Sequence, residues 1–210
     1  MKFKTDANLF TGDDLTPDID EADLLRAQCY SLLAQLLVRP PDRELLARVA
    51  ALKGDDTPFG SALSRLAAVA GQTEEAMAER EYFALFIGVA RGELVPYGSY
   101  YLTGFLNEKP LAKLRADMQA LGIARKTDVK EPEDHIASIC EMMAGLIVGS
   151  FGAPADLAAQ RGFHDRHLAP WGGRFFADLT QAQAASLYQP VGEIGQLFLA
   201  IEAEAFSMTG

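Results

Sequence analysis

The chain has 210 residues, of which 49% are hydrophobic, and a formal net charge of −10. This size and composition fit one large domain or two small ones and argue against global disorder. The charge argues against nucleic-acid binding, which needs clustered Lys and Arg, and favours solubility or a cationic partner.

The predicted elements, taken in chain order, are helices. Residues 1–15 are mixed and acidic and lack the apolar core of a signal peptide, so we expect a flexible N-terminus there. Beyond residue 15, apolar residues recur at helical spacing and strand-like alternation is missing. We therefore expect an all-α, single helical-bundle domain over residues 16–210. The predicted helices are Asp18–Val38, Asp42–Leu52, Gly60–Ala70, Glu74–Ile87, Leu111–Leu121, Pro132–Val148, Pro154–His167, Arg174–Leu187 and Gly192–Phe206.

Two features set the expected organisation of this bundle. Asp18 and Glu21 form a capping-box pattern, which predicts the start of the first helix. The polar run Ala124–Lys130 precedes Glu131, and we expect a hinge over residues 124–131 between two helical halves.

The cysteines and the apolar runs indicate in which compartment of the cell the protein resides. Cys29 and Cys140 stand alone in apolar helical surroundings, which is typical of reduced, buried thiols in a cytosolic protein. The longest apolar runs, such as Met142–Val148, are too short to cross a bilayer. We expect a cytoplasmic protein without membrane insertion.

The connection from Gly88 to Pro110 stands out, with four glycines, two prolines and several aromatic residues. A compact domain seldom keeps so long an irregular segment without a use for it. Its aromatic residues fit either a contact surface for an apolar ligand or peptide, or a loop packed onto its own core. These residues are Tyr97, Tyr100, Tyr101 and Phe105.

The segment from Glu131 to His135 reads Glu-Pro-Glu-Asp-His and lies where a long apolar helix is predicted to begin. Pro132 suits the first helical position, and acidic groups are favoured at the positive end of the helix dipole. A helix start therefore explains most of the segment. It does not explain His135, because a cationic imidazolium is disfavoured there.

Chemical motifs are few. His164 and His167 are three residues apart and, with His135 and Asp134, suggest a metal site, but their position near a helix end explains them better. The chain has no GxSxG elbow, no Walker A loop and no GxGxxG after a strand. We expect no enzyme activity, no metal and no cofactor. A small helical hydrolase that uses Asp134 and His135 stays as an alternative.

Together, two segments resemble the signature patterns of the TorD/DmsD family, the cytosolic chaperones of molybdenum-containing redox enzymes. The first runs from Tyr82 to Phe86 (Tyr-Phe-Ala-Leu-Phe), and the second is Glu131 to His135. The resemblance implies an all-helical fold, sometimes domain-swapped. It also implies binding to the twin-arginine leader of a client precursor until its cofactor is inserted. The run Gly92–Pro110 is most similar to members paired with formate dehydrogenases.

The resemblance carries a leader-binding role over to Glu131, Pro132, Asp134 and His135. A twin-arginine leader has a cationic end followed by an apolar stretch, so its receptor needs carboxylates beside apolar surface. The sequence offers one further carboxylate and several apolar or aromatic side chains for this purpose: Glu93, Tyr97, Tyr101, Tyr82, Leu85 and Phe86.

Three questions stay open from the sequence. They are the identity of the client, whether a nucleotide or molybdopterin species binds, and whether the protein is a monomer or a domain-swapped dimer. An assembly subunit of a redox complex, with the aromatic loop as a permanent interface, is a second alternative to the chaperone.

Overall fold

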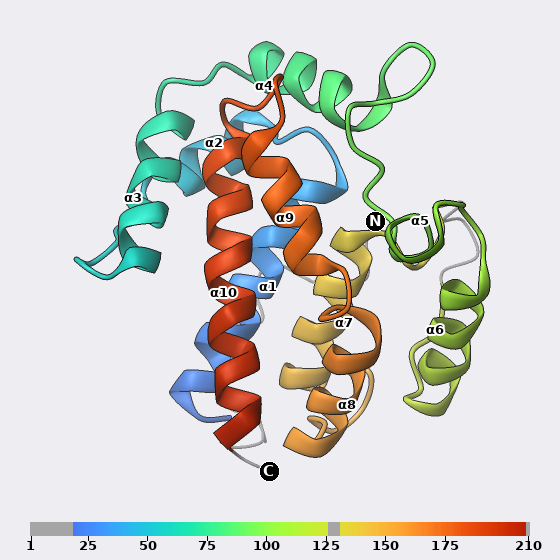
Figure 1. The fold of residues 1–210 in the computed structure, drawn as a ribbon. Coiled ribbons are helices and arrows are strands. Elements are labelled where there is room, and N and C mark those ends of the chain that lie inside the picture. Colours follow the sequence, from blue (N-terminus) through green and yellow to red (C-terminus); the bar gives the residue numbers. More distant parts are fainter. Residues whose placement is uncertain (1–18, 126–130, 209–210) are drawn as a thin grey trace.

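The computed structural model describes residues 19–125 and 131–208, and this part of the chain is a bundle of helices without strands (Figure 1). The all-α prediction is confirmed. The elements are α1 Glu21–Val38, α2 Arg43–Ala50, α3 Pro58–Ala70, α4 Glu75–Tyr82, the π-helix η1 Phe83–Ile87, α5 Gly98–Thr103, α6 Lys109–Ala120, α7 Ile136–Val148, α8 Leu157–His167, α9 Gly172–Gln181 and α10 Tyr188–Met208.

The centre of the bundle is α7. Eleven of its 13 residues are buried, and a helix that is apolar on all sides belongs in the interior. It packs along α1, while α10 packs along α9 and α3. In Figure 1, α5 and α6 lie at one edge of the molecule beside α7 and α8, on the side opposite α2 and α3.

Helix starts and ends differ from the predictions at several places. The helix predicted from Pro132 begins only at Ile136, with His135 as its cap, so Pro132 lies before the helix. The first helix is capped by Asp20, whose side chain accepts the N–H of Asp23, and Asp18 lies outside the described residues. The helix predicted to end at Leu187 stops at Gln181, and α10 begins at Tyr188 instead of Gly192. Pro190 falls in the first turn of α10, where a missing N–H costs no helical hydrogen bond.

The long connection between residues 88 and 110 is partly helical. It begins at Gly88, whose φ of 63° lies in the left-handed region and ends η1. It then contains the short helix α5, and α6 starts at Lys109.

Several expectations on organisation lie partly outside the described residues. This holds for the flexible N-terminus over residues 1–15 and for residues 126–130 of the hinge.

Both cysteines are free, with Cys140 buried and Cys29 half-buried, and burial raises the pKa of Cys140 to about 12. Across the described residues, no helix combines the length and the apolar character that crossing a membrane requires.

Candidate functional site

The segment from Glu131 to His135 lies against the residues that lead into α5. The N–H of Gly98 donates to the carbonyl oxygen of Asp134 at 2.9 Å, and the N–H of Ile136 donates to that of Pro96 at 2.9 Å. An isolated antiparallel bridge therefore joins Tyr97 to His135. Two segments far apart in the sequence meet here and fix α5 against the start of α7.

Asp134 reinforces this junction from inside. Its carboxylate is 2% exposed, and Oδ2 accepts the N–H of Ser99 at 2.7 Å. Its Oδ1 and the hydroxyl of Ser99 are buried and have no hydrogen-bond partner within the part of the chain that the structure describes. Asp134 thus anchors α5 and is withdrawn from the solvent.

His135 caps α7 as a neutral imidazole. Its Nδ1 accepts the N–H of Ala137 at 3.1 Å, and its ring meets that of Tyr97 edge-on at 5.1 Å. Burial lowers the pKa of His135 to about 4, so the ring is uncharged near neutral pH. The expectation that a helix start gives His135 no structural role was therefore wrong, because it considered only the imidazolium.

Glu133 is a structural residue that the sequence analysis missed. Its buried carboxylate accepts hydrogen bonds from Arg115 of α6 at 2.8 and 3.0 Å and pairs with Arg125 at 3.3 Å. No local pattern indicates these pairs, because Arg115 lies 18 residues earlier in the chain. The pair with Arg115 fastens the segment to α6, and the pair with Arg125 fastens it to the residues that follow α6.

Glu131 is the exposed carboxylate of the segment. It accepts a hydrogen bond from the hydroxyl of Tyr97, which is half-buried. Burial and the nearby charge of Glu131 raise the pKa of Tyr97. Pro132 beside it is half-buried. A carboxylate offers about four acceptor positions, so Glu131 keeps capacity for a cationic partner.

Glu93 and Tyr101 point to other parts of the bundle. The carboxylate of Glu93 accepts the N–H groups of Gln183 and Ala184 at 2.6 and 3.1 Å, which ties the loop to the α9–α10 connection. The hydroxyl of Tyr101 donates to Asp178 of α9 at 2.9 Å. The structure therefore does not bring Glu93 into hydrogen-bonding contact with the Glu131–His135 segment.

The signature from Tyr82 to Phe86 is divided between core and surface. Tyr82 and Leu85 are buried, and the half-buried Phe86 packs edge-on against Tyr82 with ring centroids 4.9 Å apart. The large apolar side chains exposed at this helix end are Phe83 and Ile87. The sequence analysis missed both, because consecutive apolar residues do not reveal which of them face outward.

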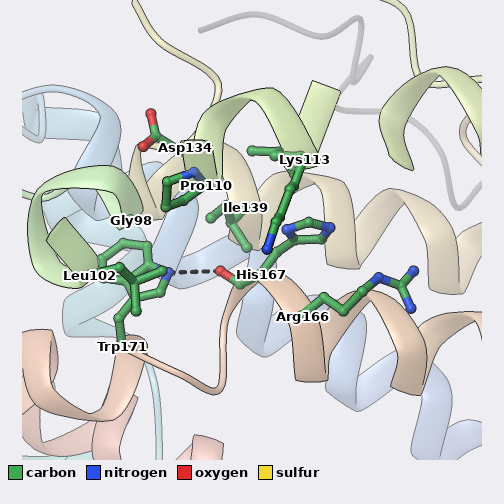
Figure 2. A pocket seen from close by; sticks show the side chains of 10 residues that line it. Gly98, Leu102, Pro110, Lys113, Asp134, Ile139, Arg166, His167 and Trp171 are labelled. Atoms are coloured by element: carbon green, nitrogen blue, oxygen red, sulfur yellow. Dashed lines mark hydrogen bonds between the residues drawn. The ribbon is translucent and has the colours of Figure 1, made fainter. Parts of the chain in front are cut away.

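A pocket of about 190 Å³ opens beside the junction, between α5, α6, α7 and α8. Figure 2 shows Gly98 and Asp134 on one side, and Lys113, Arg166 and His167 on the other. The indole N–H of Trp171 donates to the carbonyl oxygen of His167 at 2.7 Å, and this hydrogen bond fixes two of the residues that line the pocket. Much of the lining is apolar, from Leu102, Pro110, Leu114, Ile139 and Trp171.

The two histidines of α8 have carboxylate partners. His167 Nε2 lies 2.6 Å from Asp117 Oδ2, and His164 Nδ1 lies 3.0 Å from Asp165 Oδ1. Over residues 19–125 and 131–208, no group of three or more His, Cys, Asp or Glu side chains is arranged to hold a metal ion.

Comparison with known proteins places the chain in a family. Residues 52–177 match the family described as the nitrate reductase delta subunit. The chain belongs to this family. Its similarity to chaperones named TorD confirms the TorD/DmsD resemblance. The link to formate dehydrogenases stays a prediction.

Relatives of the TorD/DmsD family match to different extents. The chain is 31% identical to the chaperone protein TorD of Vibrio cholerae over 126 residues, 57% of each protein. It is 24% identical to the chaperone protein TorD of Shewanella pealeana over 214 residues, 90% of this chain and 93% of that protein. The chain thus spans little more than half of the Vibrio relative that it matches.

A solved structure supports the fold. A redox enzyme maturation protein from Archaeoglobus fulgidus superposes with a TM-score of 0.59 at 18% identity and covers 92% of this chain and 99% of that one. The curated relatives of this TorD/DmsD member are named chaperones, and this supports the expectation that the chain is not an enzyme.

Proposed function

We propose that the chain is a cytoplasmic maturation chaperone. It binds the twin-arginine leader of a molybdenum-containing oxidoreductase precursor and assists cofactor insertion before export. Membership of the TorD/DmsD family supports this class of function. The structural observation that carries the proposal is the partly apolar pocket that Asp134 lines, together with the exposed carboxylate of Glu131 in the same segment.

The chemistry of this surface suits such a leader. Leu102 lines the pocket and is 44% exposed, and Phe105 and Leu106 extend apolar surface from it along the α5–α6 loop. An apolar stretch gains roughly 1.5–3 kcal/mol for each large side chain that it buries. An arginine that meets Glu131 gains a charge-assisted hydrogen bond of about 1.5–3 kcal/mol.

The remaining predicted site residues take a supporting role in this proposal. Asp134 and His135 are buried and hold α5 in place, so they shape the pocket wall without touching the arginines. Glu93 and Tyr101 brace the same loop against the α9–α10 region. Loss of Asp134 or His135 would therefore weaken leader binding indirectly, through movement of α5.

The hydrolase alternative fits this geometry poorly. A general base needs a free lone pair within reach of its substrate, and His135 Nδ1 already accepts the N–H of Ala137. The description of the family as a delta subunit favours a different second candidate, a stable subunit of a mature redox enzyme.

Calorimetric titration with a synthetic peptide tests the proposal. The peptide carries an Arg-Arg pair followed by an apolar stretch. We expect Leu102→Asp to weaken binding by about tenfold or more, which corresponds to about 1.4 kcal/mol. The matched control is Leu25→Asp at an exposed leucine of α1, which should bind like the wild type. Equal affinities in all three proteins would contradict a leader site at this pocket.

A pull-down from the native cytosol separates the two candidates. The chaperone should capture an unprocessed precursor and lose it when the leader is deleted. A permanent subunit should stay with the mature enzyme, and its binding should not depend on the leader.

A further inference from the structure

Helices α6 and α8 form a basic edge beside the pocket. Together they carry five Lys and Arg residues and two Asp residues, whereas the whole chain has a net charge of −10. Lys113 and Arg166 of this edge line the pocket (Figure 2). Arg166 pairs with Asp117 at 2.8 Å, while Lys113 is exposed and has no ion-pair partner among residues 19–125 and 131–208. The pocket therefore offers a positive charge beside its apolar walls.

The apolar part of the pocket has room for one large side chain. A cavity of about 150 Å³ with apolar walls can hold a benzene ring, and this pocket measures about 190 Å³. Pro110, Leu114 and Ile139 line it, and Leu102 adds a wall that is 44% exposed. The pocket therefore suits a segment in which an acidic group lies close to a large apolar side chain.

Such a segment occurs in the same chain, before the first residue that the structure describes. Leu9 and Phe10 are adjacent, and Asp13 and Asp14 follow them in the direction of α1. The segment thus combines the two chemical features that the pocket requires, an aromatic ring and a pair of carboxylates a few residues away.

The start of α1 is close enough to the pocket for this segment to reach it. Arg26, about 8 Å along α1 from its start, donates to Gln160 of α8 at 3.0 Å. From Gln160, α8 extends about 10 Å to His167, which lines the pocket. An extended chain covers about 3.3–3.6 Å per residue, so the stretch from Phe10 to residue 19 spans up to about 30 Å. This length is sufficient.

We propose that the segment Leu9–Asp14 binds in this pocket of its own chain, with Phe10 between the apolar walls and the two aspartates beside Lys113. A segment joined to its site by a short connection has an effective concentration in the millimolar range, so even a weak site is filled. The proposal modifies the expectation of a flexible N-terminus over residues 1–15. It does not depend on the proposed function, but it implies that a leader bound at the pocket must displace this segment.

Photo-crosslinking within the full-length chain tests this placement. Benzoylphenylalanine takes the place of Phe10 in one protein and of Phe3 in a matched control, and mass spectrometry of the digested proteins locates the crosslinks. We expect position 10 to crosslink to Leu102 or Leu114 of the same molecule, whereas position 3 should not. Equal crosslinking from both positions, no crosslink from position 10, or a covalent dimer would overturn the proposal.

A charge exchange gives an independent readout. Asp13→Lys combined with Asp14→Lys should lower the yield of the position-10 crosslink by about threefold, as for the loss of an exposed ion pair. The further change Lys113→Glu should restore the yield, and the control Asp6→Lys should leave it unchanged. An unchanged yield in the first variant, or no recovery in the second, would overturn the placement beside Lys113.

A synthetic twin-arginine peptide separates this inference from the proposed function. If the leader binds at the pocket, the peptide should lower the yield of the position-10 crosslink by displacement. A peptide that binds and leaves the yield unchanged would contradict leader binding at the pocket and keep the N-terminal segment there. Normal binding of the peptide to a chain that gives no position-10 crosslink would overturn the inference alone.

Discussion

His135 is a helix cap that depends on its protonation state. A cap accepts an N–H from the first turn, and the lone pair on Nδ1 provides that acceptor as long as this nitrogen carries no proton. Protonation of the ring removes the acceptor and puts a positive charge at the positive end of α7. The stability of the whole fold is therefore coupled to this one titration.

The direction of this coupling follows from the two pKa values. In the unfolded chain His135 takes up a proton near pH 6.5, whereas burial lowers its pKa in the fold to about 4. Between these values the unfolded state binds more protons, so stability falls as the pH falls from 6.5 toward 4. From pH 7 to pH 5, we expect His135 to account for a loss of about 2 kcal/mol in the free energy of unfolding.

Urea unfolding at the two pH values measures this effect. His135→Asn is the matched variant, because Asn caps helices well and does not titrate in this range. The pH-dependent loss should be smaller in His135→Asn than in the wild type by about those 2 kcal/mol. An identical pH dependence in both proteins would show that His135 is not the titrating group.

The sequence located the Glu131–His135 segment, but not what its side chains do. Capping rules predict a helix that starts at Pro132, but α7 starts at Ile136 and has no acidic residue in its first turn, so the family resemblance alone marks the segment as important. The partners that decide its role are Ser99 and Arg115, which lie 35 and 18 residues away from Asp134 and Glu133. Pairings over such distances follow from tertiary packing, which no local pattern contains.

At the scale of elements, the start of α10 is capped from outside its own sequence. Glu81 of α4 accepts the N–H groups of Ser186, Leu187 and Tyr188 at 2.7, 3.1 and 2.8 Å. A negative charge at a helix N-terminus is favoured by the dipole and by the otherwise unpaired N–H groups. This contact sets where α10 begins and joins it to α4.

Removing this cap should destabilise the bundle. We expect Glu81→Ala to lower the free energy of unfolding by about 1–3 kcal/mol, because three amides lose a charged acceptor. Glu79→Ala on the same helix removes an exposed carboxylate and should change stability by less than about 0.5 kcal/mol. Hydrogen exchange at residues 186–188 should accelerate in the first variant alone. Equal exchange in both variants would contradict the cap.

Some helix boundaries follow from caps that are local in the sequence. Asp42 and Thr57 cap α2 and α3 with their own side chains, and those helices lie close to their predicted ranges. The break between α9 and α10 depends on Glu81 and Glu93, which are about 90 to 105 residues away. The apolar periodicity continues through the break and does not reveal it.

At the scale of the whole molecule, a buried ionic network joins α1 to α10. The guanidinium of Arg26 binds both carboxylate oxygens of Glu202 at 2.6 and 2.9 Å, and the hydroxyl of Tyr30 donates to the same carboxylate at 2.9 Å. Arg26 also donates to Gln160 of α8 at 3.0 Å. Helices α1 and α10 thus meet at the fully buried carboxylate of Glu202, and Arg26 links them to α8.

The same helix carries a second, exposed ion pair. Glu193 of α10 pairs with Arg65 of α3, and both side chains are more than a third exposed. Solvent screens such a pair, whereas a buried pair leaves an uncompensated charge when one partner is removed. The two pairs therefore allow a comparison within one helix.

We expect Glu202→Ala to lower the free energy of unfolding toward the lower end of about 3–5 kcal/mol, because Arg26 and the hydroxyl of Tyr30 lose a buried partner together while Arg26 keeps its ion pair with Asp23. Glu193→Ala should cost at most about 1 kcal/mol.

The double variant Arg26→Leu with Glu202→Leu separates lost charge pairing from lost packing, since it removes both charges and keeps apolar volume. It should recover part of the loss if the unpaired charge is the cause. Urea unfolding of all four proteins at neutral pH measures these differences. Equal losses for Glu202→Ala and Glu193→Ala would show that the buried network does not hold α1 and α10 together.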